Sequence, residues 1–93
     1  MDEPKDGEWK ITYSNGDHFV GTCREGRPEG YGICKYANGA VYSGEWKEGG
    51  REGQGKCVFA NGEIYDGVWE KDHVSLRGLG TLSFQDGRVH EFS

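Results

Sequence analysis

The chain has 93 residues and a formal net charge of −5, because 16 Asp and Glu outnumber 11 Lys and Arg. This balance repels nucleic acid and anionic membranes, and no apolar run approaches the roughly 18 residues of a membrane-spanning helix. Only 33% of the residues are hydrophobic, but 13% are aromatic and 17 are glycine, which predicts one small domain, or a piece of a longer protein, with tight turns and packed rings.

The N-terminal residues and the cysteines indicate where such a chain works. Residues 1–6 are polar and acidic and do not resemble a secretory or transit peptide, so we expect a disordered tail. Cys23, Cys34 and Cys57 are an odd set of thiols, which favours reduced cysteines in the cytoplasm. The cytoskeleton and the cytoplasmic face of a membrane are the candidate locations there.

From residue 7 onward the sequence repeats a turn motif, an aromatic residue followed two residues later by Asn-Gly or Asp-Gly, at spacings of 23, 23 and 25 residues. Its four copies are Tyr13-Ser-Asn15-Gly16, Tyr36-Ala-Asn38-Gly39, Phe59-Ala-Asn61-Gly62 and Phe84-Gln-Asp86-Gly87. Asn-Gly is typical of two-residue type I′ turns, in which both residues have positive φ. The pattern therefore predicts hairpins that turn at 15–16, 38–39, 61–62 and 86–87.

Strands follow from these turns, because no stretch shows a helical apolar period. The predicted strands span residues 8–14, 17–23, 31–37, 40–46, 54–60, 63–69, 79–85 and 88–92. At the second turn, the predicted register sets Tyr36 opposite Val41, Cys34 opposite Ser43 and Ile33 opposite Gly44. The expected fold is all-β: an elongated, twisted, single-layer antiparallel sheet of stacked β-hairpins with a period of about 23 residues.

Two further elements complete each repeat. An aromatic-x-Gly-x-aromatic element follows the turn, as in Tyr42-Ser-Gly44-Glu-Trp46 and Tyr65-Asp-Gly67-Val-Trp69, with Phe19-Val-Gly21-Thr-Cys23 as the first copy. A glycine pair then follows, in Gly30-Tyr-Gly32, Gly53-Gln-Gly55 and Gly78-Leu-Gly80. We expect each glycine between aromatic residues to leave a notch for a neighbouring ring.

The repeat boundaries define the domain, a single array over residues 7–93. It contains a half repeat at 7–12, full repeats at 13–35, 36–58 and 59–83, and a partial repeat at 84–92. The third full repeat carries two extra residues in the loop 71–76. Trp9 and Phe92 stand where internal repeats have glycine, so we expect them to cap the ends of a complete small array.

Side-chain alternation sorts the residues onto two faces of the expected sheet. One face is predicted to collect Tyr13, Ile11, Val20, Tyr36, Cys34, Val41, Phe59, Cys57, Ile64, Phe84, Leu82 and Val89. The other is predicted to collect Phe19, Gly21, Cys23, Tyr31, Ile33, Tyr42, Gly44, Trp46, Val58, Tyr65, Gly67, Trp69, Leu79 and Phe92. A single layer with apolar groups on both faces must curl or be covered.

Over about residues 7–92, the Tyr-x-Gly-x-Trp, Gly-x-Gly and Asn/Asp-Gly pattern closely resembles the MORN repeat. The resemblance implies a groove lined by the repeated aromatic residues and a role as scaffold or targeting module. It also implies phosphoinositide or membrane binding, or end-to-end dimers, as alternatives. The family's loop after the tryptophan is typically basic, whereas here the loops read Glu25-Gly-Arg-Pro-Glu29, Glu48-Gly-Gly-Arg-Glu52 and Glu70-Lys-Asp-His73.

The cysteines, histidines and glycine pairs could form catalytic or metal sites, but structural roles explain them more simply. Cys34 and Cys57 occupy one repeat position, two strands and roughly 9–10 Å apart, too far for a disulfide, so we expect core thiols. Cys23, in a tryptophan position, is expected to be more exposed. His18, His73 and His90 hold unrelated positions and are expected on the surface; zinc shared with a cysteine, especially between two molecules, is the alternative. No cofactor, nucleophile motif or phosphate loop is expected, since no helix follows the glycine pairs.

The sequence therefore predicts a non-catalytic protein-interaction or scaffolding module. The candidate binding residues, which would line an aromatic groove, are Phe19, Tyr31, Tyr42, Trp46, Tyr65 and Trp69. The expected partner is a peptide or helix in the groove, or a second copy of the chain as a homo-oligomer. Binding to an anionic membrane lipid is an alternative that the acidic charge disfavours, and an accessory region of an enzyme elsewhere is another.

Overall fold

The computed structural model describes residues 7–75 and 79–92, with Phe92 as backbone only. These residues form nine strands and no helix: β1 (Gly7–Thr12), β2 (His18–Arg24), β3 (Arg27–Lys35), β4 (Val41–Lys47), β5 (Gly50–Val58), β6 (Ile64–Glu70), β7 (His73–Val74), β8 (Gly80–Ser83) and β9 (Val89–Phe92). The expected tail 1–6, Gly78 of the third glycine pair and the capping side chain of Phe92 lie outside the described residues.

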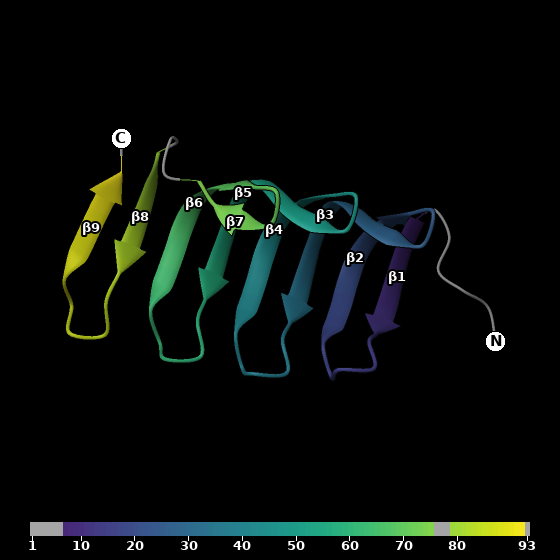
Figure 1. Cartoon of the computed structure of the whole chain (residues 1–93), viewed down its shortest axis with the longest axis horizontal. Helices are drawn as coiled ribbons and strands as arrows, with labels where there is room; N and C mark the ends of the chain where they lie inside the picture. Colours follow the sequence, from purple (N-terminus) through teal and green to yellow (C-terminus); the bar gives the residue numbers. More distant parts are fainter. Residues whose placement is uncertain (1–6, 76–78, 93) are drawn as a thin grey trace.

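All the strands join one antiparallel sheet in the order β1-β2-β3-β4-β5-β6-β8-β9, and β7 pairs with β6 off this path. Figure 1 shows this sheet as a row of hairpins along the long axis of the molecule. The principal extents are 46 × 24 × 16 Å. The predicted all-β, single-layer array of stacked hairpins is therefore confirmed.

The Asn-Gly turns differ from the prediction of type I′ turns. The N–H of Gly39 donates to the carbonyl of Tyr36 at 3.0 Å, and the N–H of Tyr36 donates to the carbonyl of Ala40 at 2.8 Å. Gly39 has a φ of 99° whereas Asn38 is not among the residues with positive φ. This is a three-residue loop, a type I turn followed by a glycine bulge. The Oδ1 of Asn38 accepts the N–H of Ala40 at 2.9 Å, which holds the loop.

The additional loop residue shifts the strand register by one. Cys34 lies opposite Tyr42, not Ser43, and Ile33 lies opposite Ser43, not Gly44. Because a one-residue slip moves side chains to the other face, the predicted assignment to faces was wrong. The inner face combines the rings with the thiols and buries Phe19, Cys23, Cys34, Tyr42, Trp46, Cys57, Tyr65 and Trp69.

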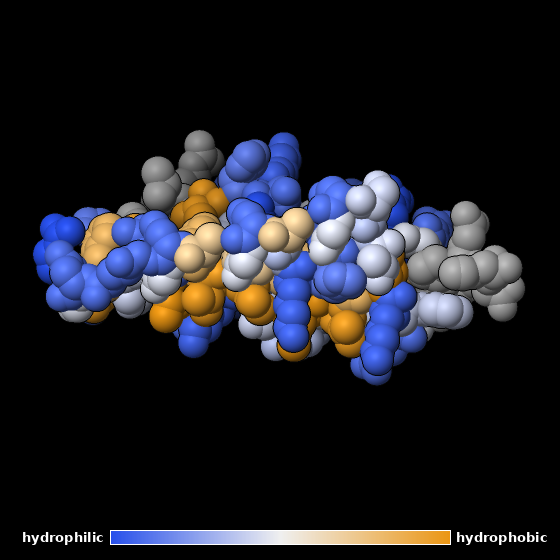
Figure 2. All heavy atoms as spheres, turned by 90° about the horizontal axis from the view of Figure 1, so that it is seen from below, coloured by the Kyte–Doolittle hydropathy of each residue, from blue (hydrophilic) through white to orange (hydrophobic). Residues whose placement is uncertain are grey.

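The opposite, outer face carries Val20, Ile33 and Val58, all of which are exposed. Val20 pairs directly with Ile33, which fixes both on this side of the sheet. Figure 2, seen from the end that carries the Asn-Gly turns, shows the hydrophobic surface as patches separated by hydrophilic side chains. The core therefore lies on one face of the single layer.

Type I′ turns do occur, at the opposite end of the sheet. Glu25-Gly26, Glu48-Gly49 and Lys71-Asp72 all have positive φ, and each joins two paired strands directly. The predicted loops are thus hairpin tips, and β3 and β5 begin four residues earlier than predicted. The register shifts between Gly21 and Cys23 and between Gly44 and Trp46 mark where these ends leave the plane of the sheet. Figure 1 shows the tips curling across the sheet.

Neighbouring tips are hydrogen-bonded to one another with the period of the repeat. The N–H of Gly49 donates to the carbonyl of Pro28, and the N–H of Asp72 to that of Arg51, both at 2.9 Å. Side chains add a second link, because Glu29 Oε1 accepts the N–H of Glu48 at 2.9 Å. The acidic residues of the loops therefore hold the tips together.

A continuous row of paired glycines crosses the inner face from β2 to β8. Its members, in order, are Gly21, Gly32, Gly44, Gly55, Gly67 and Gly80. Cβ atoms on Gly32 and Gly55 would collide with the rings of Phe19 and Tyr42, respectively. The predicted notches are thus present, and the backbone register places Trp9 and Phe92 at the two ends of the row.

Candidate functional site

Five of the six predicted binding residues lie together on the inner face. Phe19, Trp46, Tyr42, Trp69 and Tyr65 form a chain of edge-to-face contacts, with successive ring centroids 5.2, 5.1, 5.1 and 5.5 Å apart. They are at most 7% exposed. Such pairs stabilise packing beyond the area that they bury, so these rings are the core of the repeat as well as the base of any groove.

Tyr31 is the sixth predicted residue, and the structure does not bring it to the others. It pairs with Glu45 on the outer face and is 60% exposed. The prediction failed here because the assumed turn placed residues of β3 on the wrong face.

The polar ends of the buried rings are hydrogen-bonded to backbone carbonyls of the sheet. The indole Nε1–H of Trp46 donates to the carbonyl of Gly32, and that of Trp69 to the carbonyl of Gly55, both at 3.1 Å. The hydroxyls of Tyr42 and Tyr65 donate to the carbonyls of Glu45 and Val68 at 2.9 and 3.0 Å. A ligand would therefore meet ring surfaces at this site, and the polar groups around them would come from the rim.

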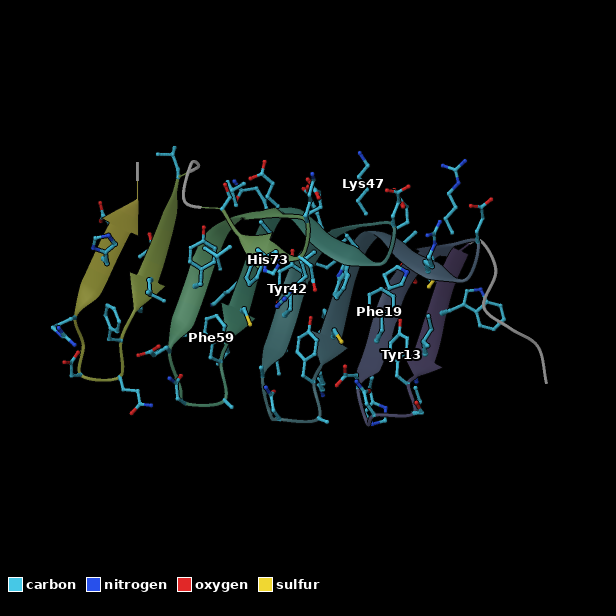
Figure 3. The ribbon with its side chains drawn as sticks, in the orientation of Figure 1. Tyr13, Phe19, Tyr42, Lys47, Phe59 and His73 are labelled. Carbon is cyan, nitrogen blue, oxygen red and sulfur yellow. The ribbon has the colours of Figure 1, made fainter. Side chains whose placement is uncertain are left out.

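A cleft of about 410 Å³ opens on the inner face at the first full repeat. It lies between the first Asn-Gly turn and the tips, and its lining is Tyr13, Ser14, Asn15, Asp17, Phe19, Pro28, Cys34, Tyr36, Trp46, Gly49 and Asp72. Figure 3 shows Tyr13 and Phe19 side by side towards the N-terminal end of the array. Phe19 and Trp46 are the two predicted site residues that the cleft reaches.

The cleft combines a neutral floor with an acidic rim. Burial, with a smaller contribution from Asp17, raises the pKa of the Cys34 thiol from 9.0 to about 11, although a hydrogen bond from Tyr36 opposes the rise. Burial also raises the pKa of Tyr36, against the influence of Arg51. Both groups therefore stay protonated at neutral pH, and Cys34 is not a thiolate nucleophile. The charged side chains in the lining are Asp17 and Asp72.

One repeat further along, Arg51 lies over the corresponding aromatic residues. Its Cζ is 4.5 Å from the ring centroid of Trp69, 5.6 Å from that of Tyr36 and 5.9 Å from that of Tyr42. Its Nε donates to Asp72 Oδ1 at 2.6 Å and its Nη2 to the Asp72 carbonyl at 2.7 Å. The arginine side chain in this cation–π and ion-pair arrangement is mostly buried, at 19% exposed, whereas the side chain of Asp72 is 55% exposed.

Sequence reasoning missed several residues that line the cleft, above all Pro28, and also Arg51 at the corresponding position of the next repeat. A comparison between repeats could have found them, because the two residues stand at equivalent positions, 23 residues apart. Arg51 is cationic there, whereas Pro28 is neutral. Cys23 was also misjudged: it pairs with Pro28 of the folded-over tip and is 2% exposed.

The described part of the chain shows neither a metal site nor a membrane-spanning helix. No group of three or more His, Cys, Asp or Glu there is placed to hold a metal ion. His18, His73 and His90 are exposed, and the Nδ1 of His18 lies 3.2 Å from the Thr12 hydroxyl. No helix among those residues is long and apolar enough to cross a bilayer.

Comparison with known proteins identifies the repeat. Residues 19–41 and 42–64 each match the family model of the MORN repeat, in consecutive units that each include one ring over the glycine row, Phe19 and Tyr42. No curated protein matches the chain significantly. MORN repeats are generally protein- or membrane-interaction modules, and their family is typically non-catalytic. With its matched repeats and the same hairpin geometry on either side of them, the chain belongs to the MORN-repeat family.

Proposed function

We propose that this chain is a protein-interaction module that binds a peptide segment of a partner in the inner-face cleft. The observation that carries the proposal is the open cleft of about 410 Å³ with an aromatic floor, a size and lining typical of binding sites. Tyrosine and tryptophan give large contact area at low conformational cost. Three buried thiols without disulfides support a cytoplasmic setting, at the cytoskeleton or the cytoplasmic face of a membrane.

The test uses two tyrosines on opposite faces as variant and control. Tyr13 borders the cleft and is 38% exposed, whereas Tyr31 is exposed on the outer face. Peptides selected from a displayed random library on the wild-type protein are titrated against Tyr13→Ala and Tyr31→Ala, and both variants are checked by thermal unfolding. We expect Tyr13→Ala to weaken binding about tenfold, as for a binding hot spot, and Tyr31→Ala to leave it unchanged. No enrichment, or equal binding by both variants, would overturn the proposal.

Self-association is the second candidate function, favoured by the two ends of the sheet. Within residues 7–75 and 79–92, β1 and β9 each pair with a neighbouring strand on one side, so their other backbone groups are available as templates for a further strand. Light scattering with size-exclusion chromatography over a range of concentrations tests this; a mass that stays monomeric throughout rules it out. Membrane lipid is the weaker alternative because of the net charge of −5, and sedimentation with anionic liposomes at low salt tests it.

A further inference from the structure

The inner face contains two sites built from the same repeat positions, 23 residues apart. The residues that correspond in kind are Tyr13 and Tyr36, Phe19 and Tyr42, Cys34 and Cys57, and Trp46 and Trp69. The first site is the open cleft, and the second is the position that Arg51 occupies. Because the repeat gives the two sites the same backbone, what fills one indicates what fits the other.

The second site is an aromatic site already filled by a guanidinium group. Arg51 lies over Trp69, Tyr36 and Tyr42, and Asp72 holds its Nε. The second site thus shows that this arrangement of rings, beside a carboxylate, accommodates an arginine side chain from the tip hairpin.

The first site has the corresponding rings, with Phe19 in place of Tyr42, but no arginine of its own. Pro28 stands at the position of Arg51, and its short ring leaves the cleft open. The neighbouring arginine, Arg27, is not part of the lining; its Nη2 lies 4.0 Å from Glu25 Oε1 and its side chain is mostly exposed.

The first site also carries its own negative charge. Gly49 replaces Asp72 at the tip, but Asp17 appears on the turn side, where the next repeat has Ala40. Asp17 lies in the lining, and its Oδ1 accepts the N–H of Ala37 at 2.8 Å, which fixes the carboxylate beside the cleft. Asp72 of the adjacent tip borders the same cleft. Asp72 is already paired with Arg51, so the carboxylate of Asp17 supplies the negative charge that a bound cation needs.

From this correspondence we infer that the cleft binds an arginine side chain of the partner segment, in the position that Arg51 fills one repeat later. The inference rests on the proposed function and specifies its ligand. The guanidinium group packs against Trp46, Tyr13 and Phe19 and pairs with Asp17. Arginine is favoured over lysine because a planar guanidinium stacks on rings and donates several hydrogen bonds in one plane, whereas an ammonium is a compact, strongly hydrated charge.

The test uses small probes, so that it does not depend on an identified partner. N-acetyl-arginine methylamide is titrated into the wild-type protein while the Trp46 indole and Asp17 amide signals are followed by NMR. The lysine and citrulline derivatives are titrated in parallel; citrulline keeps the planar shape without the charge. We expect saturable shifts with arginine, about fivefold weaker binding with lysine, and none with citrulline.

Two variants and a matched control connect the binding to the proposed residues. Asp17→Asn keeps an oxygen for the Ala37 N–H but removes the charge, and we expect it to weaken arginine binding about fivefold or more. Asp66→Asn makes the same change on the outer face and is expected to have no effect, since Asp66 lies opposite Lys56 in the strand register there, away from the cleft. Pro28→Arg supplies an internal arginine and is expected to abolish probe binding while the protein stays folded.

The outcomes distinguish this inference from the proposed function. Library peptides that depend on Tyr13 but lack a required arginine, together with no response to the arginine probe, would overturn the arginine site and leave the peptide-binding module standing. Equal responses to arginine, lysine and citrulline, or equal effects of Asp17→Asn and Asp66→Asn, would also overturn it. A selective arginine response with no enriched peptide would support the site and contradict the module.

Discussion

The ring of Tyr42 in β4 lies over Gly55 in β5, so closely that any Cβ on the glycine would collide with the tyrosine hydroxyl and ring carbons. The same relationship joins Phe19 to Gly32 and Tyr65 to Gly80. The glycine row is therefore the surface on which the rings pack, and the missing side chains are what allow one ring per repeat to lie flat on a single layer.

Gly55→Ala is predicted to destabilise the protein by about 3 kcal/mol, because overpacking a buried site forces ring or backbone to move. Urea unfolding, followed by tryptophan fluorescence, measures the change. Gly50→Ala, in the same strand, is the control: its Cβ would meet nothing closer than Asp72 Cβ at 3.5 Å, so we expect a change within about 0.5 kcal/mol. Similar losses in both variants would contradict the packing role of Gly55.

Tyr42→Phe is predicted to cost about 1 kcal/mol, the net contribution of a typical hydrogen bond. The hydroxyl of Tyr42 donates to the carbonyl of Glu45 at 2.9 Å. Tyr31→Phe removes the same group from an exposed ring on the outer face and is expected to change stability very little. Chemical denaturation measures the free energy of unfolding of both variants. An equal loss of stability in Tyr31→Phe and Tyr42→Phe would contradict a stabilising role of the Tyr42 hydrogen bond.

Arg51→Met is predicted to destabilise the protein by about 1–2 kcal/mol, since it removes the cation–π contacts of a mostly buried guanidinium group together with its ion pair to Asp72. Arg88 is the matched control. It also pairs with a carboxylate, Asp86, at 2.7 Å and lies 4.9 Å from a ring, that of Phe84, but its side chain is 73% exposed. Arg88→Met is therefore expected to cost no more than about 0.5 kcal/mol. Thermal unfolding at low and high salt measures both, and equal costs would show that burial of Arg51 contributes nothing.

Alkaline pH is predicted to destabilise the fold through Cys34. Burial raises the pKa of this thiol from 9.0 to about 11, so between these values the folded protein holds a proton that the unfolded chain releases. The free energy of unfolding therefore falls as pH rises through this window and is unaffected by this group below it. Urea unfolding between pH 8 and 10.5 measures the slope. Cys34→Ala is expected to make the fall shallower; the same slope in variant and wild type would exclude this origin.

The fold was largely predictable because its repeat consists of residue types with strong local conformational preferences. The aromatic residue before Asn-Gly, the glycine pair and the Tyr-x-Gly-x-Trp element each recur with one period, which predicts hairpins, their number and their stacking. The turn geometry was not predictable in the same way. Asn38-Gly39 suits both a two-residue type I′ turn and a three-residue type I turn with a glycine bulge, and local sequence does not distinguish them.

The candidate site was only partly predictable, for the same reason. Phe19, Tyr42, Trp46, Tyr65 and Trp69 were identified from their periodicity, whereas Tyr31 was assigned to the wrong face through the one-residue register error. The open cleft was missed because it depends on what differs between repeats, the pair Pro28 and Arg51, and not on what they share.

The sequence by itself determined the hairpins, the period and the pairing of large rings with glycines, because each of these follows from local conformational preference and periodicity. Only the tertiary structure decided which face each side chain occupies, since Cys34 packs beside Tyr42 once the three-residue loop sets the register. It alone also decided that the acidic tips fold across the sheet, where Gly49 bonds to Pro28 and Asp72 to Arg51. These two hydrogen bonds join neighbouring tips. With the tips folded over, Arg51 fills one aromatic site, and the preceding site, beside Pro28, stays open.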